Sequence, residues 1–197
     1  MRALLPTLLL AAAEAANFPF EESTLTEDLI SDSGIDALSF GDASSVASPP
    51  RCKAAPGTDA WPADAEWEAL GDFLGGALLK PSPPAAVCYE DHELHDEDAC
   101  RDIRLNAGSS RFFIDDPVTV LTSWPQGDSC PLNPAGNQTC TQGGFPEYVV
   151  NVTEVWQIQA AVNFARNNDL RLVIKFVPPF PIPSLNTNSF LISWGAS

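Results

Sequence analysis

The sequence contains few basic residues, and this shortage excludes one broad class of function. Only 10 of its 197 residues are Lys or Arg, against 26 Asp and Glu, so the formal net charge is −16. The basic residues form no cluster along the chain, whereas a nucleic-acid-binding surface needs a basic patch or stripe. We therefore expect no nucleic-acid partner.

The sequence also lacks an apolar run long enough to cross a bilayer, which needs about 20 residues. Its N-terminal apolar run, Leu4 to Ala13, is shorter than that. The run follows Arg2 and ends in the A-x-A sequence Ala13-Glu14-Ala15. This order of basic residue, apolar core and small residues is typical of a secretory signal peptide. We predict a signal peptide at residues 1–16, rather than a short membrane anchor, and a secreted protein with no membrane span.

Familiar catalytic motifs are missing as well. The sequence has no Gly-rich phosphate loop and no G-x-S-x-G, H-E-x-x-H or C-x-x-C, so no motif assigns a catalytic residue. Both histidines, His92 and His95, lie in the acidic stretch 89–100. Imidazole and carboxylate can ligate zinc, but a metal site needs convergent geometry that this stretch does not specify. We interpret it as a solvated acidic loop and assign no metal ligand.

Five cysteines agree with the oxidising compartment that secretion implies. Two short spacings suggest the disulfides Cys88–Cys100 and Cys130–Cys140 and leave Cys52 over, although sequence alone does not fix the connectivity. Two N-x-T sequons predict glycosylation at Asn137 and Asn151. Asn151 must then lie at the exposed end of its strand.

An acidic segment follows the signal peptide. Residues 17–50 contain seven acids and many serines, with no Lys or Arg to balance them. This composition predicts a disordered, solvated leader more readily than a binding segment. The folded part is expected to start near Cys52.

The fold prediction centres on residues 146–175. Tyr148 to Val152 is β-branched and aromatic after a proline, which favours a strand. Thr153 can N-cap a helix that opens at Glu154 and ends at Asn167 or Asn168. The helix should bury one face formed by four residues, Val155, Ile158, Val162 and Ala165. The apolar run Leu170 to Ile174 then predicts a strand buried on both faces of a parallel sheet. Together these elements predict one βαβ unit.

Other elements flank this unit. Asp64 can cap a helix that places Trp67, Leu70 and Leu74 on one face, and a short strand at Ala77 to Leu79 follows Gly75-Gly76. We also expect a short helix capped by Asp96 or Asp98, which carries Cys100 and Ile103, and a strand at Val118 to Leu121.

The chain changes character after Lys175. Four prolines, Pro178, Pro179, Pro181 and Pro183, follow in quick succession. Such a run favours polyproline II over a strand ladder. We therefore predict that residues 176–197 form an aberrant proline-rich tail, of translated intron or out-of-frame origin, and not the next element of the fold.

An ordered set of short features runs through the chain from Cys52 to Lys175. They are Cys52-Lys53, Pro56-Gly57, Trp61-Pro62, Trp67, Leu70, Gly75-Gly76, Leu78, Pro84, Cys88, Asp115-Asp116-Pro117, Tyr148-Val149-Val150-Asn151 and Phe164-Ala165 with Leu170 to Lys175. Together they resemble the N-terminal part of secreted fungal FAD-linked oxidoreductases of the berberine bridge enzyme-like group. That group belongs to the vanillyl-alcohol oxidase and p-cresol methylhydroxylase (PCMH) flavoprotein superfamily.

The resemblance implies an α+β fold that contains an incomplete PCMH-type FAD-binding domain. In that family the strand matching Leu170 to Lys175 leads into a G-H-D turn whose histidine commonly bonds the flavin. This sequence has no histidine after His95, so the resemblance implies truncation before the flavin-attachment turn and leaves only Lys175 as a candidate cofactor-binding residue. The expected division is residues 1–16, 17–50, a disulfide-bearing helical region at 51–114, a partial FAD-binding domain at 115–175, and the tail at 176–197.

The resemblance also implies a function. The family oxidises alcohols, sugars or natural products, small-molecule substrates whose electrons pass through FAD to oxygen. We expect this chain to be an inactive form that neither holds FAD nor oxidises a substrate. The alternative is a non-enzymatic, cysteine-containing secreted protein that acts by interaction.

Overall fold

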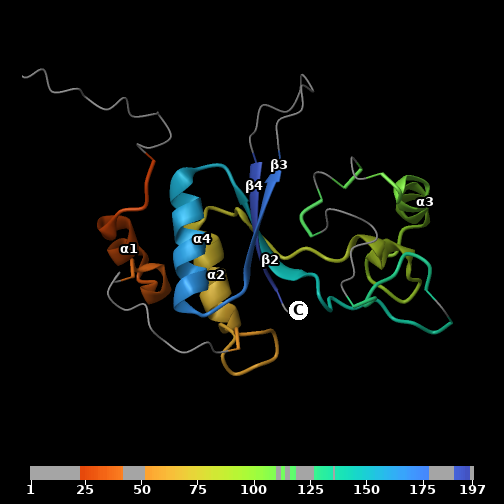
Figure 1. Ribbon diagram of the computed structural model, residues 1–197, viewed down its shortest axis with the longest axis horizontal. Coiled ribbons are helices and arrows are strands. Elements are labelled where there is room, and N and C mark those ends of the chain that lie inside the picture. The colour runs from red at the N-terminus through yellow and green to blue at the C-terminus, as the bar shows by residue number, and fades with distance from the viewer. Residues whose placement is uncertain are drawn as a thin grey trace, which may run out of the picture.

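The computed structural model describes residues 23–41, 52–109, 112–113, 116–118, 127–134, 136–177 and 189–195. Figure 1 shows two lobes on opposite sides of a small sheet. We call the helices and strands around the sheet the α/β lobe, and the loops around α3 the disulfide lobe. The predicted signal peptide lies outside the described residues. No helix in the described part of the chain is long and apolar enough to cross a membrane.

The sheet has the strand order β1-β2-β4-β3. Its strands are β1 (Leu78–Leu79), β2 (Pro146–Val152), β3 (Leu172–Val177) and β4 (Ser189–Gly195). β4 pairs antiparallel with both β2 and β3. β2 and β3 thus run in the same direction, as a βαβ unit requires, but they are not neighbours. The predicted parallel sheet is wrong because β4 lies between them.

The prediction that residues 176–197 form no part of the fold is also wrong. β3 continues through Phe176 and Val177, and β4 supplies a central strand. Ile192 and Trp194 of β4 are fully buried. The four prolines lie outside the described residues, and Ser189–Gly195 contains none, so its apolar alternation can form a full ladder.

The apolar run before Lys175 is less buried than its composition predicted. Val173 and Ile174 of β3 are each 56% exposed. They point to opposite faces of the sheet because successive residues of a strand alternate. A continuous apolar run therefore does not mark a strand buried on both faces here.

Two helices cover one face of the sheet. α2 (Asp64–Phe73) buries Trp67 and Leu70, and Leu74 after it is also buried, which confirms the predicted face. Trp67 stacks on Tyr148 of β2 with ring centroids 4.0 Å apart, and its ring centroid lies 5.4 Å from that of Trp194. These contacts tie α2 to the two central strands.

The second helix, α4 (Val155–Asn167), starts one residue later than predicted, with Glu154 at its N-cap and Asn168 at its C-cap. Its predicted buried face is correct in part: Ala165 is buried and Ile158 packs against the core, whereas Val162 is 37% exposed. The helix also buries Gln157, Ala160, Ala161, Asn163 and Phe164. The small alanines allow close packing, and α4 has neighbours on two sides, the sheet and the N-terminal segment.

Most of the predicted disordered leader is folded. Residues 23–41 form α1 (Glu27–Ser33) and the 3-10 helix η2 (Asp36–Leu38), which lie outside α4 in Figure 1. Leu25, Ile30 and Leu38 are buried in the main core. Asn163 Nδ2 of α4 donates to the Leu38 carbonyl at 2.9 Å. The prediction of disorder from composition failed because three buried apolar side chains hold this segment on the core, while α4 supplies hydrogen-bond partners for its backbone. Residues 17–22 and 42–50 lie outside the described residues.

The disulfide lobe has its own small core. It contains the 3-10 helix η4 (Pro84–Cys88) and α3 (Glu97–Asn106), which Asp96 caps through its carboxylate. Its buried members are Ala85, Ala86, Tyr89, Val118, Cys130, Phe145 and Val149. Both predicted disulfides are present, with Cα–Cα distances of 4.9 Å for Cys88–Cys100 and 4.2 Å for Cys130–Cys140. Of the predicted strand Val118 to Leu121, residues 119–121 lie outside the described residues.

Candidate functional site

The face of the sheet opposite α4 carries two of the residues that the sequence singled out. Strand register aligns Asn151 of β2 with Leu191 of β4, and Leu191 with Lys175 of β3. Residues aligned in this way share a face. The structure therefore brings Asn151 and Lys175 into one row, two strand spacings apart, or about 9–10 Å.

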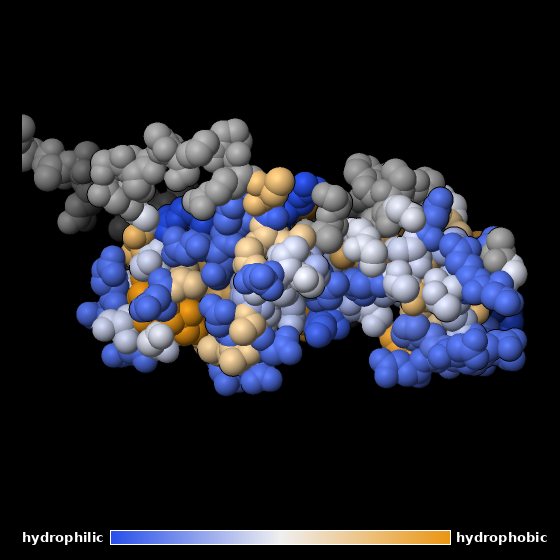
Figure 2. Space-filling view, turned by 90° about the horizontal axis from the view of Figure 1, so that it is seen from below, coloured by the Kyte–Doolittle hydropathy of each residue, from blue (hydrophilic) through white to orange (hydrophobic). Residues whose placement is uncertain are grey.

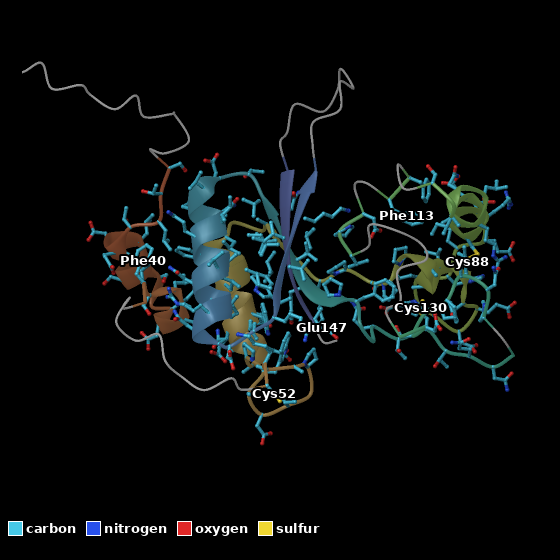
Figure 3. All side chains as sticks on the ribbon, in the orientation of Figure 1. Phe40, Cys52, Cys88, Phe113, Cys130 and Glu147 are labelled. Atoms are coloured by element: carbon cyan, nitrogen blue, oxygen red, sulfur yellow. A yellow bond between two sulfur atoms is a disulfide. The ribbon has the colours of Figure 1, made fainter. Side chains whose placement is uncertain are left out.

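Lys175, the candidate flavin-binding residue, is engaged by protein groups. Its Nζ donates to the carbonyls of Phe113, at 3.1 Å, and Asp116, at 2.6 Å. Phe113 is buried, and Figure 3 places it on the disulfide-lobe side of the sheet. The ammonium group thus anchors the segment around Phe113 to β3.

Backbone N–H groups at the N-termini of the longer helices also have acceptors within the protein. A phosphate commonly binds such an end through free backbone N–H groups. At α4, Gln157 Oε1 accepts from the N–H groups of Thr153 and Glu154 at 2.9 and 3.1 Å. The Ser23 carbonyl accepts from Trp156 N–H at 3.0 Å. The N–H groups of Thr153, Glu154 and Trp156 around the start of α4 therefore have protein acceptors.

The other two long helices hold carboxylates at the same place. Glu66 Oε2 accepts from Ala63 N–H before α2 at 2.9 Å. Asp96 Oδ1 accepts from Asp98 and Ala99 N–H at the start of α3, both at 2.9 Å. The carboxylates of Glu66 and Asp96 lie at these helix starts, where they would repel a pyrophosphate.

Three buried donors have no hydrogen-bond partner among the described residues: Trp67 Nε1, Trp194 Nε1 and Asn168 Nδ2. Trp67 and Trp194 lie within one aromatic cluster in the core, where a charged pyrophosphate would lose its hydration. The residues that the structure describes therefore do not fit the pyrophosphate of FAD.

The acidic stretch of the disulfide lobe is exposed, and Figure 2 shows hydrophilic surface at the right-hand end. His92 Nδ1 accepts from Leu94 N–H at 3.1 Å. Among the described residues, no group of three or more His, Cys, Asp or Glu side chains is placed to hold a metal ion. His92 and His95 are thus not brought together with other ligands in this part of the chain.

Tyr89 connects the two disulfide-bonded loops. It follows Cys88, and its hydroxyl donates to the carbonyl of Pro131, next to Cys130, at 2.7 Å. Burial raises the pKa of the Tyr89 phenol above its ordinary value of 10.0. No sequence motif singled out Tyr89, although an aromatic residue beside a disulfide cysteine is a usable signal for a local core.

The unpaired cysteine and the two residues predicted to be glycosylated lie at the surface. Cys52 is free and exposed, and Figure 3 shows it below α2. Asn137, between Cys130 and Cys140, is exposed. Asn151 is exposed near the end of β2, as its predicted glycosylation requires.

Comparison with known proteins identifies the homologues. No family model matches the chain. The chain is 38% identical over 125 residues to the FAD-linked oxidoreductase apf9 of Gibberella fujikuroi. The matched region is 63% of this chain and 21% of that protein. The chain is 35% identical over 128 residues to the VAO-type flavoprotein oxidase VAO615 of Thermothelomyces thermophilus, which covers 64% of this chain and 22% of that protein.

The solved structures that are similar to this chain are also VAO-type flavoproteins. The crystal structure of the VAO-type flavoprotein MtVAO615 from Myceliophthora thermophila C1 superposes with a TM-score of 0.57 at 33% identity, over 61% of this chain and 22% of that one. MtVAO713 from the same organism gives a TM-score of 0.52 at 33% identity, over 62% of this chain and 22% of that one. The chain thus spans about a fifth of the length of the relatives that it matches. Its homologues are fungal FAD-linked oxidoreductases and VAO-type flavoproteins, and its structural neighbours are VAO-type flavoproteins.

Proposed function

We propose that this chain supplies the sheet-and-helix scaffold of a secreted FAD-dependent oxidase, and that it does not retain FAD by itself. The observation that carries the first part is the 33% identity to MtVAO615 over a superposed region with a TM-score of 0.57. When bound, FAD would accept a hydride from a small-molecule substrate and pass electrons to oxygen. The names of the relatives do not favour a non-enzymatic interaction protein.

The second part of the proposal rests on hydrogen-bond donors that already have acceptors within the protein. At the starts of the three longer helices, the side chains of Gln157, Glu66 and Asp96 accept from backbone N–H groups. The Lys175 ammonium donates to two backbone carbonyls. The residues described here hold the fold together, and they orient no group toward a flavin.

A chimera separates the two parts. This chain would replace the matching 128-residue segment of VAO615 from Thermothelomyces thermophilus, and the purified chimera, the parent and the isolated chain would be compared for flavin absorbance after incubation with FAD. We expect flavin in the parent and the chimera and none with the isolated chain. A soluble, folded chimera without flavin would contradict the scaffold role, and a yellow isolated chain would contradict the claim that the chain alone retains none.

A lysine substitution sharpens the test of Lys175. In the chimera, Lys175→Met keeps the length of the side chain and removes its charge. If Lys175 only anchors the segment around Phe113, we expect lower stability with flavin content unchanged in the folded fraction. Loss of flavin at unchanged stability would instead assign Lys175 to the cofactor.

A further inference from the structure

Asn151 occupies a distinctive position on the sheet face opposite α4. The preceding residue on this face, Val149, is fully buried under the disulfide lobe. Asn151 lies next along the same face of β2 and is exposed. The disulfide lobe therefore covers this face of β2 at Val149 but not at Asn151, whose side chain is exposed to solvent.

The backbone of Asn151 is fixed while its side chain is available. Its N–H donates to the Ala77 carbonyl at 2.9 Å, and the residue pairs with Leu191 of β4. Within the described residues, its side-chain amide makes no hydrogen bond. The amide thus projects from a rigid strand into open space, and it takes no part in holding the fold.

The local sequence adds the recognition signal for a modification. Asn151-Val152-Thr153 is an N-x-T sequon, the acceptor signal for N-glycosylation in the secretory pathway. The sequon spans the end of β2 and the turn into α4. Its central residue, Val152, is buried on the opposite face, so attached sugar leaves the core undisturbed.

We propose that Asn151 carries an N-linked oligosaccharide that covers the open part of this sheet face. In this step Asn151 Nδ2 forms a bond to the anomeric carbon of a lipid-pyrophosphate-linked oligosaccharide. The bond from that carbon to the pyrophosphate oxygen breaks, the lipid pyrophosphate leaves, and the amide nitrogen loses one proton. The proposal rests on the predicted secretion of the chain and is independent of flavin binding.

The glycan has a structural consequence. Val173 of β3 is 56% exposed and aligns with Ser193 and, across β4, with Val149, so it shares the face of Asn151. An oligosaccharide rooted about 9–10 Å from β3, two strand spacings away, would be long enough to reach this apolar position. It would keep another protein from packing on the row of Asn151 and Lys175.

The test uses the full chain, secreted from a yeast host under its own N-terminus. Enzymatic release of N-glycans in heavy-oxygen water converts a glycosylated Asn into labelled Asp, which peptide mass spectrometry locates. We expect the label at Asn151 in most molecules. Release should also proceed on the native protein without denaturant, because the sheet face is open.

Two variants keep the test decisive if one of them fails to fold. Asn151→Gln removes the acceptor, and Thr153→Ala removes the signal while Asn151 remains, so each should abolish the label at position 151. Asn137→Gln, which alters the other exposed sequon, should leave it. An unlabelled Asn151 in the wild-type protein, whether because the chain is not translocated or because the site is closed, overturns the proposal, as does release that requires denaturation.

Discussion

The two faces of β2 contact cores of different kinds. Tyr148, Val150 and Val152 point into the α/β lobe, whose core gathers large side chains such as Trp67 and Trp194. Val149 points into the disulfide lobe, whose core is smaller and lined by disulfide cysteines. One lobe depends on apolar burial, whereas the other depends on two covalent links. The same strand thus joins regions whose stability has different physical sources.

The largest expected effect is in the α/β lobe. Trp194→Ala should lower the free energy of unfolding by about 3–5 kcal/mol, because it empties a fully buried aromatic site. The free energy of unfolding is measured by urea denaturation, with far-UV circular dichroism as the signal. Val173→Thr in the neighbouring strand is the matched control, and at 56% exposure it should change stability by about 0.5 kcal/mol or less. Equal effects of the two substitutions would mean that β4 does not belong to the core.

Removal of a disulfide should act on the other lobe. Replacing Cys130 and Cys140 with serine removes a disulfide with a sequence separation of 10. From the entropy of loop closure, its loss should lower the free energy of unfolding by about 3 kcal/mol. We expect hydrogen exchange to accelerate in α3 and residues 127–145 while α4 remains protected. If α4 loses protection to the same extent, the two lobes do not differ in the proposed way.

The docking of the N-terminal segment gives an intermediate effect. Asn163→Ala leaves the Leu38 carbonyl without its buried donor, at a cost of about 1–3 kcal/mol. The measurement is the proteolytic cleavage rate within residues 23–41, which should rise. Asn167→Ala removes bonds to the carbonyls of Ala37 and Ser39 at an exposed position and should have the smaller effect, because water can replace these bonds. Unchanged cleavage in both variants would argue that this segment is not held by α4.

Tyr89→Phe should give the smallest effect, about 0.5–1.5 kcal/mol, from loss of the bond to Pro131. It also carries a pH dependence. Burial raises the pKa of Tyr89 in the folded state, so above about pH 10 the unfolded chain releases the phenolic proton more readily and stability falls as pH rises. The difference between wild type and variant should therefore shrink at high pH. A constant difference from neutral pH to pH 11, about one unit above the ordinary tyrosine pKa, would contradict burial of the phenol.

Local patterns predicted much of the fold. The elements around Trp67, Tyr148 and Cys100 form as expected, since helix periodicity, a β-branched run and a capping aspartate are all local signals. Both disulfides follow from short cysteine spacing. Asn137 and Asn151 are exposed as sequons require.

Contacts between distant segments could not be predicted in this way. Nothing local says that β4 enters between β2 and β3, because strand pairing depends on residues about forty positions apart. The folding of residues 23–41 likewise depends on Asn163 and on the surface of α4. Lys175 was assigned from a family resemblance, whereas its bonds to Phe113 and Asp116 come from tertiary structure.

Hydrogen exchange of the full, oxidised chain, resolved by peptide mass spectrometry, tests the central contrast between the lobes most directly. We expect the amides of β2, β4 and α4 to exchange slowest and to keep their protection after mild reduction, whereas α3 and residues 127–145 should lose theirs. The contrast between the lobes would be contradicted if β4 exchanged as fast as the chain termini, or if reduction released both lobes together.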